Sequence, residues 1–118
     1  GFIMKKPISD LKDFITEYDK LSKEYNSIVK NIPVQVTLSE EYDGIIFLLS
    51  ELDKKVTVLS NLSRVSLEPA KLVDFQVVIS ALDIMIMQKL IEVQRSQYVF
   101  DMSRLREAIE RLEIKVSQ

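Results

Sequence analysis

The chain has 118 residues, with 16 basic and 18 acidic side chains and a formal net charge of −2. This length fits one compact domain, and so small a charge gives no overall field that would attract nucleic acid or an anionic membrane. Cysteine and histidine are both absent. Their absence excludes disulfides, thiolate nucleophiles, imidazole bases and zinc sites built on sulfur or imidazole.

The composition predicts an all-α fold. Glycine occurs twice and proline three times, and Pro69 is the last of either. We expect residues 1–8 to form a flexible N-terminal segment, in which Gly1 to Ile3 are a cloning or leader remnant, and residues 9–118 to form a single helical bundle domain. The apolar runs fall short of the roughly 20 residues of a membrane span, and no secretory signal follows Lys5 and Lys6. A cytoplasmic location is therefore the default expectation.

The first predicted helix covers residues 9–32. Ser9 and Asp10 offer N-cap chemistry, and Pro33 ends the helix because the residue before a proline is pushed out of the helical region. Apolar residues recur between them at alternating spacings of three and four, which is a heptad seam. The members of this first seam are Leu11, Phe14, Tyr18, Leu21, Tyr25, Ile28 and Ile32.

The second predicted helix covers residues 39–64, after a short extended connector at 34–37. Thr37 or Ser39 is its cap, and early acidic residues suit the positive helix N-terminus. Gly44 lies inside it, either to admit a close backbone contact or as a merely tolerated residue that costs about 1 kcal/mol of helix propensity. The second seam consists of Tyr42, Ile45, Leu49, Leu52, Val56 and Leu59.

The third predicted helix covers residues 69–95, with Ser66 available as a cap and Pro69 in its first turn. Between 70 and 93 its apolar side chains point in nearly every direction, which predicts burial on several sides. A chain of this size seldom surrounds one of its own helices, so we expect another chain to cover part of the surface between Val77 and Ile91. Asp83 either lies on a narrow solvent-exposed strip with Ser80 and Gln76 or pairs with a cation such as Arg64, Lys71 or Arg95.

The fourth predicted helix covers residues 101–116, with Asp101 as its cap. Because no glycine or proline separates it from the third, one continuous helix of about 45 residues is the alternative. We favour the break, which gives an antiparallel bundle of four helices with coiled-coil-like seams. The third seam consists of Tyr98, Met102, Leu105, Ile109, Leu112 and Val116.

No catalytic, metal-binding or cofactor-binding pattern is found. Glu40, Glu41 and Asp43 are better explained as a helix start than as a cation site, and no glycine-rich phosphate loop is present. The sequence therefore predicts a non-enzymatic protein interaction module, an adaptor, scaffold or structural subunit that binds protein partners and forms a homo-oligomer. The predicted interface residues are Val78, Leu82, Met85, Ile86, Met102, Leu105, Ile109 and Leu112.

A second hypothesis concerns the arginines of the C-terminal third. Arg95, Arg104 and Arg111 would contact phosphates if the Arg95 to Lys115 face belonged to an accessory subunit of a nucleic-acid-binding complex. Acidic residues interleave with these arginines, so a solvated, ion-paired coiled-coil flank is the favoured interpretation.

Overall fold

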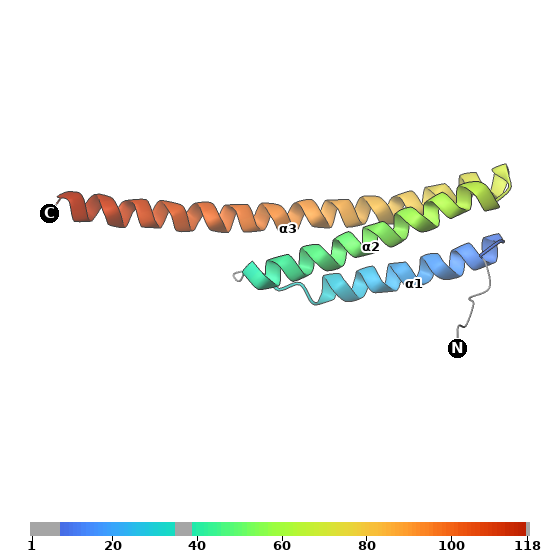
Figure 1. Cartoon of the computed structure of the whole chain (residues 1–118), viewed down its shortest axis with the longest axis horizontal. Helices are drawn as coiled ribbons and strands as arrows, with labels where there is room; N and C mark the ends of the chain where they lie inside the picture. The colour runs from blue at the N-terminus through green and yellow to red at the C-terminus, as the bar shows by residue number, and fades with distance from the viewer. Residues whose placement is uncertain (1–7, 35–38, 118) are drawn as a thin grey trace.

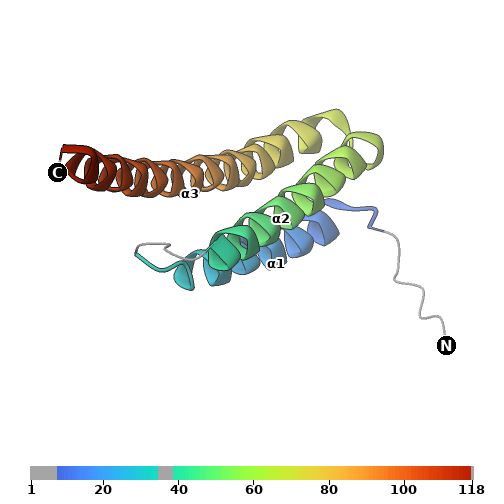
Figure 2. The ribbon, with the colours of Figure 1, turned by 60° about the vertical axis from the view of Figure 1, so that its left-hand side comes forward.

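The structure, a computed structural model, describes residues 8–34 and 39–117 and contains three α-helices (Figure 1). These are α1 (Leu11–Lys30), α2 (Ser39–Ser66) and α3 (Pro69–Ser117), and no strand occurs in the described ranges. Successive helices run in opposite directions, so α2 is antiparallel to both α1 and α3 (Figures 1 and 2). The predicted all-α class is confirmed.

The molecule is elongated. Its principal dimensions are 74 × 37 × 21 Å and its radius of gyration is 20.8 Å, whereas a compact domain of this length has about 13 Å. The elongation comes from α3, which has 49 residues against 28 in α2 and 20 in α1. The C-terminal part of α3 therefore runs past the ends of α1 and α2 (Figure 1).

The prediction of four helices is wrong. The ranges 69–95 and 101–116 are parts of one continuous helix, which the sequence offered as the alternative. Asp101 does not cap a new helix, because it lies inside α3 and accepts a hydrogen bond from Gln97 Nε2 one turn earlier (3.2 Å). With no proline or glycine after Pro69, nothing interrupts the backbone ladder.

Helix α1 begins at the predicted cap. The Asp10 carboxylate accepts a hydrogen bond from the Asp13 backbone N–H (2.9 Å), which satisfies one of the free donors of the first turn. At the other end, the Asn31 backbone N–H donates to the Ile28 carbonyl (3.2 Å) and the Ile32 N–H donates to the Val29 carbonyl (3.1 Å), which closes the helix. Of the predicted flexible N-terminus at 1–8, the structure describes only Ile8, which is half-buried against the core, while residues 1–7 and the connector and cap at 35–38 lie outside the described residues.

Only Leu67 and Glu68 connect α2 to α3. Pro69 is the first residue of α3, where its missing N–H costs nothing. Leu67 is buried, and its backbone N–H donates to the Ser63 carbonyl (2.9 Å). This short connection forces α3 to fold back along α2 and sets which faces of the two helices meet.

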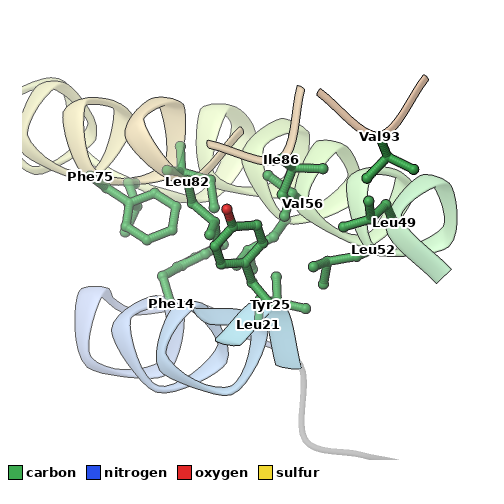
Figure 3. Close-up of a cluster of buried hydrophobic side chains, with 13 residues drawn as sticks. Phe14, Leu21, Tyr25, Leu49, Leu52, Val56, Phe75, Leu82, Ile86 and Val93 are labelled. Atoms are coloured by element: carbon green, nitrogen blue, oxygen red, sulfur yellow. The ribbon is translucent and has the colours of Figure 1, made fainter. Parts of the chain in front are cut away.

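All three helices contribute to one core (Figure 3). Phe14 of α1 and Phe75 of α3 pack as a tilted aromatic pair with 5.4 Å between ring centroids, a favourable geometry. The Tyr25 hydroxyl donates to the Met85 carbonyl (3.5 Å), and Lys55 Nζ bonds Glu24 Oε1 (2.9 Å) on the rim. The first and second predicted seams are confirmed, since every member is buried or half-buried.

Replacing Phe14 by alanine is expected to lower the free energy of unfolding by about 3–5 kcal/mol, because the cavity removes contacts with both neighbouring helices. Thermal or urea unfolding at fixed protein concentration, followed by circular dichroism, measures this loss. Phe47→Ala on the exposed side of α2 is the control and should change stability little. Equal losses in the two variants would contradict this description of the core.

Gly44 lies in open space, because a Cβ added there would meet no atom within 4 Å. Of the two interpretations, the tolerated residue is therefore correct. Gly44→Ala is expected to raise the free energy of unfolding by about 0.5–1 kcal/mol through the backbone entropy of the unfolded chain. A loss of stability in the same unfolding measurement would show that the small side chain is needed.

Candidate interaction surface on α3

Helix α3 carries two apolar stripes on nearly opposite faces. The inner stripe packs against α1 and α2, and its buried members are Phe75, Ile79, Leu82, Ile86 and Val93. The second stripe faces away from the body, and we call it the outer seam. It consists of Val73, Val77, Ser80, Ile84, Met87, Ile91, Gln94, Tyr98, Met102, Leu105, Ile109, Leu112 and Val116.

Every member of the outer seam is exposed in this chain. Its apolar side chains have exposed fractions from 42% at Met102 to 87% at Val116. Valine, isoleucine and leucine at these positions are the residue types that the same protein buries in its core. Scattered apolar residues are normal on a protein surface, but a contiguous stripe is typical of an interaction site.

The spacing of the outer seam is that of a coiled coil. From Val73 its members follow at alternating steps of four and three as far as Tyr98, then once at four to Met102, and again at alternating steps to Val116. The pattern spans about 65 Å at 1.5 Å per residue. One extra step of four is a stutter, which coiled coils accommodate by local unwinding.

The two stripes behave differently beyond the body. Val93 is the last buried residue of α3, and we call residues 94–117 the C-terminal extension. Within it the inner stripe continues through Gln97 and Phe100, which are half-buried, and then becomes polar with Arg104, Glu107 and Arg111. The outer seam, in contrast, is apolar from Tyr98 to Val116. The extension is therefore built to be covered on the outer side and not by α1 or α2.

The structure separates the predicted interface residues into two groups. Leu82 and Ile86 are 2% and 0% exposed, so they fill the core of this chain and cannot meet another one. Val78 is half-buried, and Met85 is exposed beside the outer seam. Met102, Leu105, Ile109 and Leu112 lie together in the outer seam and are exposed, so their assignment to an interface stays a prediction.

Sequence reasoning expected exposed apolar surface between Val77 and Ile91 but did not identify the outer-seam residues that form it. Val77, Ile84 and Ile91 are 68%, 55% and 59% exposed, which confirms that the chain does not enclose the apolar surface between 77 and 91. Nearly every position of this stretch is apolar, so the periodicity alone could not separate the stripe facing α2 from the one facing outward. The exact seven-residue spacing from Val77 to Tyr98 was the available signal.

Helix α2 also exposes apolar side chains, including Leu48, Val58 and Leu62. Charged residues break this stripe, because Glu51 pairs with Lys54 (2.9 Å) and Lys55 pairs with Glu24 of α1 (2.9 Å) between them. The outer seam of α3 has no charged member. It is the longer apolar surface and the better candidate.

The arginines named in the second hypothesis do not share one face. Arg104 and Arg111 are two turns apart on the same side, whereas Arg95 lies roughly 160° around the axis from Arg111 at 3.6 residues per turn. The Arg104 guanidinium also stacks over the Phe100 ring, 5.7 Å from its centroid. Arg95 and Arg104 nevertheless line one hollow with Phe100 and Glu107, and Arg111 is not part of it, so the structure does not bring the three proposed phosphate contacts together.

Asp83 lies with Ser80 and Gln76, as the first of its two interpretations expected, and no salt bridge joins it to Arg64, Lys71 or Arg95. It lines a groove of about 270 Å³ with Gln76, Ser80 and Arg64, but its closest charged neighbour is the carboxyl group of Asp53 on α2. Each of these two carboxylates has one buried oxygen without a hydrogen-bond donor among the described residues. Gln76, in contrast, donates from Nε2 to Ser63 Oγ (2.9 Å) across the same helix pair.

This carboxyl pair raises the pKa of Asp53 to about 6. The largest cause is a hydrogen bond with Asp83 that needs a proton on one partner, followed by burial and by the charge of Asp83. Two ionised carboxylates cannot donate to each other, which explains why the buried oxygens lack donors. The pair favours a shared proton between α2 and α3.

No group of three or more acidic side chains that could hold a metal ion forms in the described part of the chain. Within residues 8–34 and 39–117, moreover, every helix is too polar or too short to cross a membrane. Comparison with protein-family models, with curated proteins and with solved structures finds no match. The residues of the chain itself therefore have to support any proposal about function.

Asp53→Asn is expected to raise the melting temperature by several degrees at about pH 8 and by clearly less at about pH 4.5. The folded pKa lies above the unfolded value of 3.8. In the wild-type protein, the contribution of the protonated Asp53–Asp83 pair to stability is therefore fully present below the unfolded pKa. It is lost as pH rises through about 6. Asparagine stays neutral throughout, so its advantage appears on the alkaline side.

Thermal unfolding across this pH range measures the effect. Asp74→Asn, an exposed carboxylate on α3, is the matched control and should shift the melting temperature equally little at both pH values. A gain for Asp53→Asn that did not depend on pH would contradict the raised pKa.

Proposed function

We propose that this chain is a non-enzymatic interaction module, a helical adaptor, scaffold or structural subunit of a larger and homo-oligomeric assembly. Its binding surface is the outer seam of α3. One observation supports this above all: a stripe of core-type side chains runs at coiled-coil spacing along the whole of α3 and is exposed in the single chain. The first two seams, which have the same spacing, are covered by neighbouring helices.

The energetics favour a partner. Full burial of one valine, leucine or isoleucine side chain contributes roughly 1.5–3 kcal/mol, so covering the outer seam offers a large driving force even after the entropy cost of association. Leaving it in water promotes non-specific aggregation. A protein that keeps such a surface uses it for a specific contact.

The C-terminal extension gives a second line of support. It is about 36 Å long at 1.5 Å per residue, and every residue in it is exposed except Gln97, Phe100 and Ala108, which are half-buried. Most helical stability in proteins comes from packing of an apolar face, and isolated helices are marginal in water. A partner helix on Leu105, Ile109 and Leu112 would supply that packing.

The test compares a double substitution in the outer seam with a single substitution outside it, both within the extension. Leu105→Asp combined with Ile109→Asp is expected to abolish both self-association and capture of any specific partner, because it places charges inside the outer seam. Ile114→Asp is the matched control: Ile114 is 58% exposed but lies outside the seam, so binding should be unchanged.

Light scattering at micromolar concentration measures self-association. Affinity capture from the native host, with mass spectrometry to identify what is bound, measures other partners. The proposed function would be ruled out by two results together. The wild-type chain would be strictly monomeric, and every protein that it captures would also be captured by the double substitution.

A further inference from the structure

We propose that the outer seam binds a second copy of the same chain, parallel and in register, as a two-stranded coiled coil from Val73 to Val116. This inference rests on the proposed function and names its partner. The body formed with α1 and α2 packs on the inner stripe of α3, so it leaves the outer side open along the full length (Figure 2). Two bodies would then flank a central pair of α3 helices.

The residue types at the two core positions of the heptad favour this arrangement. Parallel two-stranded coiled coils prefer β-branched residues at position a and leucine at position d. Position a holds Val77, Ile84 and Ile91 and, after the stutter, Met102, Ile109 and Val116. Position d holds Val73, Ser80, Met87 and Gln94 and, after the stutter, Tyr98, Leu105 and Leu112. Leucine never occupies a, and the extension has no β-branched residue at d.

Polar members of the seam specify the register. Ser80 and Gln94 both occupy position d, so in a parallel pair aligned without offset each lies opposite the same residue of the second copy. The two Gln94 side-chain amides can then hydrogen-bond to each other. A polar residue at a core position sets alignment in this way at a cost in stability. In an antiparallel pair over the same length, Ser80 would instead lie against Ile109 of the second copy.

The charged residues that flank the outer seam also favour the parallel, in-register pair. In the parallel pair the g position of one helix meets the e position of the next heptad on the other, which brings Asp101 beside Arg106 of the second copy, once on each side. No like charges meet at the remaining flanking positions. The full-length antiparallel pair would place Asp74 beside Glu113, and an antiparallel pair of extensions would place Arg106 beside itself.

The surface is large enough for a stable dimer. With exposed fractions between 42% and 87%, the apolar members of the outer seam present on the order of 1,000 Å² per chain, compared with about 800 Å² per partner in a standard interface. The stutter at Tyr98 and Met102 lies where α3 leaves the body. Local unwinding there lets one helix pair follow both segments.

Cysteine cross-linking tests the orientation, because the chain has no cysteine of its own. Leu112→Cys is a mild change at an exposed d position, and in the parallel pair it brings the two sulfurs within reach of a disulfide. We expect nearly complete cross-linking to a covalent dimer after mild oxidation. Ile114→Cys, also in the extension but outside the seam, should give little.

Two mixtures identify the competing arrangements. Leu112→Cys mixed with Met102→Cys would form a mixed disulfide in an antiparallel pair of extensions, and Leu112→Cys mixed with Val77→Cys would do so in the full-length antiparallel pair. Either mixed disulfide formed in preference to the Leu112 homodimer would overturn the parallel arrangement. Sedimentation equilibrium of the wild-type chain should give the mass of two chains, and a trimer or tetramer would overturn the two-stranded pair.

A monomeric wild-type mass would remove the second copy as the partner. The two proposals then separate: capture of an identified protein that Leu105→Asp with Ile109→Asp abolishes would keep the interaction function and replace its partner. A monomer that captures nothing through the seam would overturn both. Circular dichroism of each cysteine variant, which should match the wild type, checks that the helices are intact.

Discussion

The architecture depends on how α2 packs against the inner stripe of α3. The two-residue connection at Leu67 and Glu68 fixes which faces meet, and Phe75, Ile79, Leu82 and Ile86 fill the space between the helices. Helix α1 completes this core through Phe14, whose ring reaches Phe75. Because α1 and α2 both pack on one side of α3, the opposite side is not covered by any of the residues that the structure describes.

Helix α3 is consequently both a core helix and a surface helix. An apolar helix in a large bundle would be enclosed on all sides, whereas 28 residues of α2 and 20 of α1 can line only part of one face of a 49-residue helix. The composition of the extension beyond residue 101 follows this geometry, because its inner positions are Arg104, Glu107 and Arg111 while its outer positions are Met102, Leu105, Ile109, Leu112 and Val116. The polar positions mark where the body ends.

Local patterns in the sequence predicted the all-α class, the cap at Asp10 and the first two seams, since each depends on residues close in the chain. The helix count failed at residues 96–101, where polar residues suggested a break but no residue there prevents helical geometry. Which apolar residues between 70 and 93 face inward could not be predicted, because that depends on the path of α2. The Asp53 and Asp83 pair was hidden for the same reason, as its members are 30 positions apart.

The continuity of α3 has a mechanical consequence. The helix belongs to the body along its first half and projects as a rod along its second, with no glycine or proline hinge between them. A helix without a breaker bends only gently, so twisting or pulling at the tip is transmitted directly to the packing of Phe75 and Ile79. A force applied to the C-terminal extension therefore acts on the extension and the three-helix body as one mechanical unit.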